Sequence, residues 1–336
     1  MLEQLAAEPD LRLAALVTDP ASVPSGVAPV RIRRIGPGRF SELEHELRLP
    51  FDIRNGDFDV FHSPGNSPPA RCRRPWVQTL HDLIPLAFDD PGFRDERRRW
   101  QRRGGRIRNA AAILADSQYT ADQAIGLLGL DPRRVHVAHL GCDARFHPPA
   151  APAEPAEPYV LYVGEYGPHK GYAEAFAAVG ALADRGHPHR LKMVSRMTPV
   201  VEQTVRTMVT SSAHPERIDL LGFVSDDDLV ALYHGAAALM VTSRAEGFGL
   251  PALEAMASGT PVVSFRNTSL TEVVGEGGVL VADGDVPGLV AEVAAIISNQ
   301  RRAEEVSASG VAHAARFTWQ SCAAVHAAVF RDAASR

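Results

Sequence analysis

Two glutamates flank a short glycine-rich turn in the segment 243–263. Glu246 and Glu254 stand eight positions apart, Gly247 and Gly249 lie between them, and Pro251 suits the first position of a helix. Glycines let a ligand approach the backbone closely, and the N–H groups at the start of a helix favour phosphate. Two acids beside a phosphate are tolerated when they accept hydrogen bonds from hydroxyls on groups attached to either side of it. A nucleotide diphosphate sugar, with a ribose on one side and a hexose on the other, has that layout.

Both acids also have purely structural explanations. A short helix is predicted over residues 252–258, ending at a cap formed by Gly259, and Glu254 would fall in its first turn. A carboxylate there stabilises a helix through the helix dipole, whether or not a ligand binds. Glu246, on the loop before the turn, would then be an ordinary solvated acid. The spacing alone leaves both explanations open.

The elements that must position these acids recur along the whole chain of 336 residues. Short apolar, β-branched runs alternate with helical patterns, which predicts an α/β protein whose parallel sheets are covered on both faces. The chain is longer than one core usually allows, and the proline-rich segment 146–158 predicts a stiff linker between two halves that meet across a cleft. The expected strands are Leu11–Thr18, Asp59–His62, Trp76–His81, Ala111–Ala115, Val135–Ala138, Tyr159–Val163, Leu191–Ser195, Ile218–Gly222, Ala237–Thr242, Pro261–Phe265 and Val279–Val281.

The beginning of the chain departs from a standard doubly wound domain. Such a domain opens with a strand and a tight turn into its first helix, whereas this chain opens with a helix-like segment at 2–7. Either the natural start lies upstream or the first domain lacks its first strand, and we favour the upstream start. The missing turn would have faced the cleft.

Composition excludes several classes of protein. A 45% apolar and 22% charged content is ordinary for a globular protein, and a formal charge of −5 argues against a nucleic-acid binder. No apolar run reaches the roughly 18 residues of a membrane span, and residues 1–8 lack the features of a secretion signal. Three scattered cysteines, without metal-binding spacing, suit a reducing compartment. The expected location is cytoplasmic.

The segment from Glu246 to Glu254, followed by the block 257–263, resembles the E-x7-E signature of retaining GT-B glycosyltransferases of family 4. Other blocks of that family occur here in the same order, and the histidine block is similar to that of the mannosyltransferase-like branch. They are His81-Asp-Leu-Ile-Pro85, 115–120, 141–143, 162–164, 169–171, 222–229 and 270–274. The resemblance covers nearly the whole chain.

The resemblance implies a GT-B fold, with two Rossmann-like doubly wound domains facing across a cleft. The acceptor-side domain would span 1–148, a linker 149–158 and the nucleotide-sugar domain 159–316, while 317–336 would return to the first domain. The implied reaction is retaining transfer of a hexose from a nucleotide diphosphate sugar, with GDP-mannose the best candidate, and without a metal or other cofactor. The acceptor would be a hydroxyl on a glycan, a glycolipid or a small glycoside. The alternative is a degenerate protein that binds a nucleotide sugar or a partner without catalysis.

The resemblance also assigns roles to residues. Glu246 would contact the transferred sugar, Lys170 would neutralise the diphosphate, and His81 would reach the sugar from the amino domain; these three are the expected catalytic residues. Glu254 would hold the ribose hydroxyls. The other expected donor-binding residues are Gly164, Arg196, Gly222, Phe223, Val224, Gly247, Phe248, Gly249 and Leu250.

Two positions depart from the family pattern. His169 and Glu165 stand where the family often has an arginine, so we predict that Arg196 supplies the second cation.

The run Asp226–Asp228 superficially resembles a metal-binding acid pair. It fits better as the first turn of a helix capped by Ser225, and we expect no metal there.

A basic stripe is the remaining candidate site. Arg94, Arg98, Arg102 and Arg106 recur at four-residue spacing, which places them on one helical face, although Gly104-Gly105 would weaken the helix there. The simpler explanation is a solvated face. The alternative is a surface for an anionic membrane or a lipid-phosphate acceptor, with the protein peripheral on the inner face of the membrane.

Overall fold

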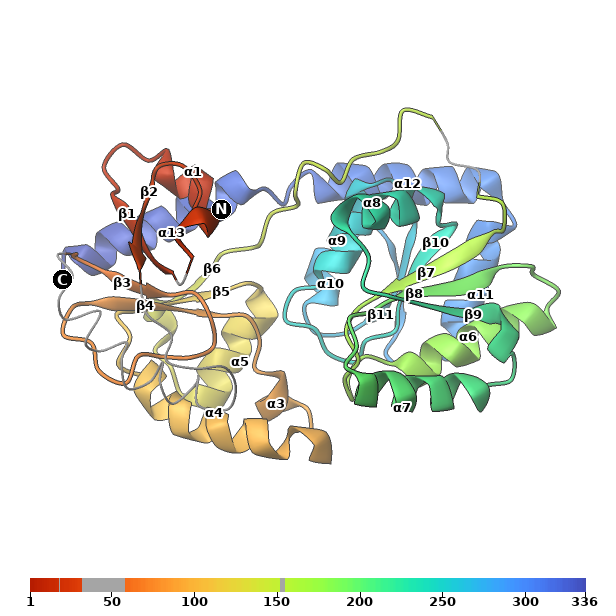
Figure 1. Ribbon diagram of the computed structural model, residues 1–336, viewed down its shortest axis with the longest axis horizontal. Helices are drawn as coiled ribbons and strands as arrows, with labels where there is room; N and C mark the ends of the chain where they lie inside the picture. The colour runs from red at the N-terminus through yellow and green to blue at the C-terminus, as the bar shows by residue number, and fades with distance from the viewer. Residues whose placement is uncertain (18, 32–57, 152–154) are drawn as a thin grey trace. The chain divides into compact units, whose positions relative to one another are not determined.

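The computed structural model describes residues 1–17, 19–31, 58–151 and 155–336 (Figure 1). The chain divides into two compact units. Unit 1 comprises Met1–Gly141 together with Thr318–Arg336, and unit 2 comprises Cys142–Phe317. None of the helices in the described ranges is long and apolar enough to cross a membrane.

Unit 1 contains two parallel sheets. A two-stranded sheet pairs β1 (Leu13–Val17) with β2 (Val27–Arg31), and a four-stranded sheet has the order β3-β4-β5-β6. The strands of the larger sheet are β3 (Phe61–Ser63), β4 (Trp76–Leu80), β5 (Ala112–Ala115) and β6 (Val135–Val137). The α-helices are α1 (Leu2–Ala6), α3 (Ile84–Ala87), α4 (Arg94–Ile107), α5 (Gln118–Leu128) and α13 (Trp319–Ala334).

The alternation of side chains along β4 explains how the larger sheet is covered. Trp76 and Leu80 point to one face, where they pack with Trp100 of α4 and residues of α5. Val77 points to the other face and packs with Val329 of α13. The last helix of the chain therefore belongs to the core of unit 1, and α1 lies against it (Figure 1).

Unit 2 is built on one six-stranded parallel sheet with the order β12-β11-β10-β7-β8-β9. Its strands are β7 (Tyr159–Val163), β8 (Arg190–Val194), β9 (Ile218–Gly222), β10 (Ala238–Val241), β11 (Val262–Arg266) and β12 (Val279–Ala282). Its α-helices are α6 (Tyr172–Asp184), α7 (Pro199–Thr210), α8 (Asp226–Gly235), α9 (Leu250–Ala257), α10 (Leu270–Val273), α11 (Val286–Ile297) and α12 (Gln300–Ala314).

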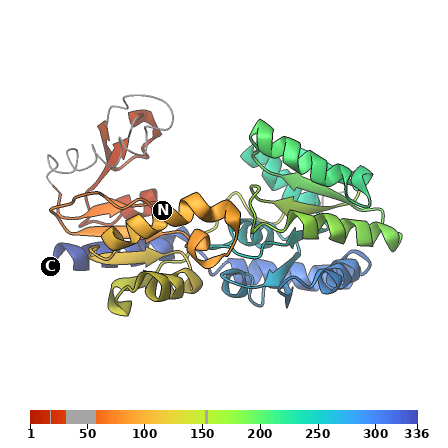
Figure 2. The same cartoon turned by 90° about the horizontal axis from the view of Figure 1, so that it is seen from below.

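Buried residues on one face of this sheet form the main core of unit 2. Val160 and Tyr162 of β7 pack there with Phe176 of α6 and Val293 of α11, two helices that lie side by side (Figures 1 and 2). Helices α8 and α9 contact β7, β10 and β11. The prediction of an α/β protein with parallel, helix-covered sheets is confirmed.

Every expected strand is present, with ends that differ from the predicted ones by at most two residues. The strand β2 was not predicted, because Val27–Arg31 is short and contains Pro29, which is unusual inside a strand. Helix α4 continues through Gly104 and Gly105, so the expected weakening does not break it. Gly104 is buried, and a Cβ at this position would lie 3.2 Å from Leu128 Cδ2, so close helix packing explains the glycine.

Candidate active site

The predicted donor-binding residues of unit 2 follow the carboxyl ends of four adjacent parallel strands. Gly164 follows β7, Arg196 lies two residues after β8, and Phe223 follows β9. Glu246 lies on the loop between β10 and α9. Because ligands of open α/β sheets bind at the carboxyl ends of the strands, this edge is the natural place for a site.

An ion pair joins two of these loops. Lys170 Nζ lies 2.6 Å from Glu246 Oε1, and the side chains are only 18% and 15% exposed. Each charge is shielded from water and is compensated chiefly by the other, so removal of one partner would leave a poorly solvated charge. The backbone N–H of Glu246 donates to Thr268 Oγ1 at 3.0 Å, which fixes the loop that carries the acid. Lysine and glutamate are thus held together at the carboxyl end of the strands.

Two hydrogen bonds fix the loop that carries Lys170. Tyr162 donates from its hydroxyl to the carbonyl of Lys170 at 2.8 Å, and Thr242 Oγ1 donates to the carbonyl of Gly171 at 2.7 Å. Gly171 is the N-cap of α6 and has φ +64°, a left-handed conformation that favours glycine. A Cβ at this position would lie 1.9 Å from the Thr242 carbonyl oxygen. Glycine is therefore required for both space and conformation.

The start of α9 has the features of an anion-binding terminus. Gly249 is its N-cap with φ +104°, and a Cβ there would lie 2.8 Å from Leu270 Cδ2. The N–H of Ala252 already donates to the Gly249 carbonyl, but the N–H groups of Gly249 and Leu250 have no acceptor among the described residues. These two groups are available to a phosphate. Phe248 is buried beside Phe317, at a ring-centroid distance of 5.9 Å, and its side chain anchors the turn.

The helix itself corrects one prediction. Because α9 begins at Leu250, Pro251 occupies its second position and Glu254 its fifth, beyond the first turn. The helix dipole therefore does not explain the presence of Glu254. The predicted end of the helix is confirmed, since Ser258 is the C-cap and Gly259 follows with φ +80°.

Glu254 is instead a partly buried acid with a specific partner. Tyr233 of α8 donates from its hydroxyl to Glu254 Oε2 at 2.9 Å. Burial raises the pKa of Glu254 to about 7, and the charges of Asp226 and Asp143 add to this rise. The Tyr233 hydrogen bond and the nearby Arg145 act in the opposite direction. The surroundings of Glu254 disfavour its charged form, and carboxyl groups with perturbed pKa values are typical of functional sites.

A second cation is present near the same edge. The exposed Arg196 guanidinium lies 4.6 Å from the ring centroid of Phe223, which is itself 68% exposed. Burial and the neighbouring Lys170 charge lower the pKa of His169 to about 4, so this histidine is neutral at physiological pH. Arg196 is therefore the better candidate for the charge that an arginine near position 169 would supply. Gly222, with φ +71°, and Val224 flank Phe223 in the sequence.

Residues after β11 complete the site and were missed by the sequence analysis. Thr268 has φ +41°, the only left-handed non-glycine residue in the described ranges, and its Oγ1 accepts the Glu246 N–H. Ser269 is fully buried and donates to the carbonyls of Glu246 and Phe248, at 2.9 Å in both cases. Backbone strain that the surrounding hydrogen bonds maintain is common at ligand-binding sites. The feature of the sequence that could have indicated these residues is the polar run Asn267–Ser269, which lies shortly after a predicted strand.

His81 lies in unit 1, immediately after β4. Its Nδ1 bonds Asp116 Oδ2 and its Nε2 bonds the Pro64 carbonyl, both at 2.7 Å. A carboxylate and a carbonyl are both hydrogen-bond acceptors, so this arrangement favours a ring that is protonated on both nitrogens. The hydrogen bond to Asp116 raises the pKa of His81, which agrees with this charge state. Contact between His81 and a bound sugar stays a prediction.

His62, the other histidine at a strand end, has a packing role. Its ring lies 5.1 Å from that of Phe330 and 5.6 Å from that of His326, both on α13. Burial lowers the pKa of His62 to about 3, and its Nε2 bonds Thr79 Oγ1 at 2.8 Å. The neutral ring is part of the packing between β3 and α13.

The three aspartates Asp226–Asp228 form the first turn of α8, as predicted. Ser225 is the N-cap, and its Oγ accepts the N–H of Asp228 at 3.2 Å. Asp226 also pairs with Arg145, which bonds Asp143 in turn. Within the described parts of the chain, no group of three or more histidine, cysteine, aspartate or glutamate side chains is arranged to hold a metal ion.

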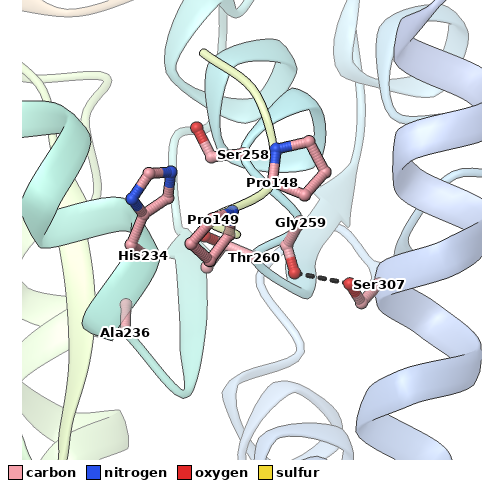
Figure 3. Close-up of a pocket in the computed structure, with 8 residues that line it drawn as sticks. All are labelled: Pro148, Pro149, His234, Ala236, Ser258, Gly259, Thr260 and Ser307. Carbon is pink, nitrogen blue, oxygen red and sulfur yellow. Dashed lines mark hydrogen bonds between the residues drawn. The ribbon is translucent and has the colours of Figure 1, made fainter. Parts of the chain in front are cut away.

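A pocket of about 270 Å³ lies at the opposite end of α9 (Figure 3). Its lining includes Ser258 and Gly259, which follow the helix, and His234 at the end of α8. Ser307 closes one side by donating to the Gly259 carbonyl at 2.6 Å, as Figure 3 shows. Neither Glu246 nor Glu254 lines this pocket, so it is separate from the site at the start of α9.

Two glycosyltransferase families match the chain. The family described as "Glycosyl transferases group 1" matches residues 143–311, and "Glycosyltransferase Family 4" matches residues 5–146. The chain belongs to the family 4 glycosyltransferases. It is therefore an enzyme that transfers a glycosyl group from a nucleotide sugar, and the non-catalytic alternative is set aside.

Individual relatives agree with this assignment. The glycosyltransferase is 29% identical over 290 residues to O-antigen chain mannosyltransferase B of Escherichia coli, which covers 83% of this chain and 76% of that protein. It is 28% identical over 308 residues to an MMP alpha-(1->4)-mannosyltransferase of Mycolicibacterium hassiacum, covering 84% and 72%. The solved structure of a sucrose-phosphate synthase from Thermosynechococcus elongatus superimposes with a TM-score of 0.75 at 20% identity, over 95% of this chain and 88% of that one. The GT-B fold is confirmed.

The buried carboxyl of Glu254 predicts an unusual pH dependence of stability. Its pKa is about 7 in the folded protein and near 4.5 in the unfolded chain, so the folded state retains a proton that the unfolded state loses. The contribution of Glu254 to stability should therefore fall as pH rises from about 4.5 to 7, and stay low above that range. Glu254→Gln removes the titration and should be about 3 kcal/mol more stable than the wild type at pH 8, from 1.4 kcal/mol per pKa unit.

Urea unfolding monitored from pH 4.5 to 8 measures this effect. Glu304→Gln, which changes an exposed glutamate of α12, is the matched control and should follow the wild-type curve. Equal stability of Glu254→Gln and the wild type at pH 8 would show that the charged Glu254 carboxylate does not destabilise the folded protein.

Proposed function

We propose that this glycosyltransferase transfers mannose from GDP-mannose, with retention of anomeric configuration and without a metal, to a hydroxyl of a glycan, glycolipid or small glycoside. The observation that carries the proposal is the arrangement around α9. A Lys170–Glu246 ion pair and two N–H groups without an acceptor among the described residues stand at its start, and a partly buried Glu254 lies one turn further on. Mannose is supported by the two mannosyltransferase relatives.

Different residues of the site bind different parts of the donor. The N–H groups of Gly249 and Leu250, with the Lys170 ammonium, bind the diphosphate and stabilise the charge that grows on it as the sugar departs. Glu246 then exchanges part of its bond with Lys170 for a hydroxyl of the sugar. Glu254 accepts hydrogen bonds from the ribose, and Gly164, Gly222, Phe223 and Val224 border the base and phosphates.

The proton of the acceptor hydroxyl goes to the departing phosphate. His81 is a poor alternative base, because both ring nitrogens already donate hydrogen bonds to acceptors within unit 1. His81 can donate to a sugar hydroxyl only in exchange for one of these two bonds, and the exposed bond from Nε2 to the Pro64 carbonyl is the candidate. No enzyme nucleophile is required when the acceptor attacks on the face that the phosphate leaves.

Nucleotide release from a panel of donors tests the proposal. GDP-mannose, GDP-glucose, UDP-glucose and UDP-N-acetylglucosamine should be compared, with and without a chelator and with α-mannosides as acceptors. We expect GDP release from GDP-mannose to be fastest, unaffected by the chelator, and accompanied by an α-linked product. Preferred release of UDP would refute the donor, and a β-linked product would refute retention.

Replacement of Arg196 tests the second cation. Arg196→Ala should raise the KM for the donor by about tenfold or more, since hydrogen bonds to charged groups contribute roughly 1.5–3 kcal/mol. Arg206→Ala is the control, because Arg206 pairs with Glu202 on the surface of α7 and should leave KM unchanged. An unaltered KM in Arg196→Ala would remove this residue from the donor site.

The arginine stripe of α4 supports a peripheral membrane or lipid-phosphate role for unit 1. Arg94, Arg98 and Arg102 are exposed, and Arg106 is half-buried. Vesicles with about 30% anionic lipid should sediment the protein at low salt, and binding should fade above roughly 0.3 M salt because the charges are screened. Arg94→Glu combined with Arg98→Glu should abolish sedimentation. Equal binding to neutral vesicles would indicate that the stripe is only a solvated face.

A further inference from the structure

Tyr233 is a buried side chain that hydrogen-bonds a carboxylate of the candidate site from the interior of unit 2. It is 0% exposed, and its hydroxyl donates to Glu254 Oε2 at 2.9 Å. Burial raises the pKa of Tyr233 well above its ordinary value, so the hydroxyl keeps its proton and remains a donor. No other side chain in the described ranges hydrogen-bonds the Glu254 carboxyl, so its second oxygen is left for another donor.

The tyrosine is itself held rigidly. Thr260 Oγ1 donates to the Tyr233 carbonyl at 2.7 Å, which ties the last turn of α8 to the segment that follows α9. The Tyr233 ring meets Phe146 edge to face, at a centroid distance of 5.8 Å and an angle of 77°. A buried ring with a fixed backbone and a fixed neighbour presents its hydroxyl in one direction only.

We propose that Tyr233 is a positioning residue, which orients the Glu254 carboxylate so that its second oxygen accepts hydrogen bonds from the vicinal hydroxyls of the donor nucleotide. This inference rests on the proposed function, because it assumes that Glu254 contacts the donor. Glu254 in a short helix has several rotamers, and the hydrogen bond to Oε2 selects one of them. It also favours the ionised carboxylate, which is the form that accepts two hydroxyl donors.

The groups that face Glu254 determine the sign of the pH effect. Asp226 of α8 and Asp143 oppose its ionisation, whereas Arg145 favours it, and the Cys142 thiol beside it is neutral because burial raises its pKa to about 12. Against this background the Tyr233 bond is the largest contribution that favours the carboxylate. Its loss would therefore raise the pH at which Glu254 becomes an acceptor.

Tyr233→Phe removes the hydroxyl and keeps the ring. Tyr159→Phe is a closely matched control, because Tyr159 is also buried and its hydroxyl donates at 2.8 Å to the carbonyl of Leu232 in the same helix. Both variants lose one buried hydrogen bond to a fixed acceptor, but only one of those acceptors is Glu254. Affinities for GDP and UDP are measured by calorimetry between pH 6 and 9 in the wild type and both variants.

We expect the nucleotide that the wild type binds to bind Tyr233→Phe about tenfold more weakly at pH 7, with the midpoint of the affinity–pH curve about one unit higher. Tyr159→Phe should keep the wild-type curve, and the kcat for bound donor should change less than KM in Tyr233→Phe. An unshifted curve in Tyr233→Phe, or an equal shift in Tyr159→Phe, would overturn the inference alone. Failure of the wild type to bind either nucleotide would overturn the proposed function as well.

Discussion

Replacing Lys170 with alanine should lower kcat by about 10²–10³-fold, the usual effect of removing one group that stabilises developing negative charge. The ammonium lies 2.6 Å from Glu246 and is only 18% exposed, so its loss both removes a charge from the diphosphate and leaves Glu246 unpaired. Lys170→Arg should recover little, because a planar guanidinium does not fit a site built around a compact ammonium. Initial rates of nucleotide release at saturating donor give kcat directly.

The sequence provides a simple control for this experiment. Lys192 is the only other lysine of the chain, and its ammonium lies 3.9 Å from the ring centroid of Tyr159, away from the loops of the site. Lys192→Met should retain wild-type kcat. A Lys170→Ala enzyme with kcat within threefold of the wild type would exclude the lysine from charge stabilisation.

Gly171→Ala should have the largest effect on stability. A left-handed conformation costs alanine roughly 1–2 kcal/mol. A Cβ here would also lie 1.9 Å from the Thr242 carbonyl oxygen, so the backbone would have to move. We expect a loss of about 4 kcal/mol or more and a fall in Tm of roughly 10 °C, with donor turnover lost because Lys170 is the preceding residue.

Gly186→Ala separates the two causes. Gly186 also has positive φ, at +83°, but nothing lies within 4 Å of a Cβ built there. Its replacement should therefore cost only the conformational part, roughly 1–2 kcal/mol, and leave turnover intact. If calorimetric scans gave equal shifts for both variants, the close contact with Thr242 would not be the reason for the glycine.

The strand pattern was predictable because parallel, buried strands have a strong local signature. Tyr159–Val163 and Ile218–Gly222 were predicted to the residue. The first is a continuous apolar run, and the second is apolar apart from Asp219 and ends at a glycine. The interpretation of Glu254 as a first-turn residue was wrong, because Gly249 rather than a later residue is the N-cap. A glycine cap has no side-chain signal, so the start of α9 could not be located from the sequence.

The supporting residues were harder to predict than the charged ones. Glu246, Lys170 and Glu254 stand in a recognisable pattern. Tyr233, Thr268 and Ser269 instead act through hydrogen bonds to residues between 21 and 23 positions away in the sequence. Such contacts depend on how β10, β11 and α8 pack in unit 2. The sequence contains no local periodicity that reports them.

Calorimetric titration of GDP into the wild type, Lys170→Ala, Glu254→Ala and Lys192→Met tests the central claim most directly. The account predicts saturable 1:1 binding to the wild type and to Lys192→Met, and affinities at least tenfold weaker in Lys170→Ala and Glu254→Ala, because the first loses a charge on the diphosphate and the second an acceptor for the ribose. Binding of equal strength in all four proteins would contradict it.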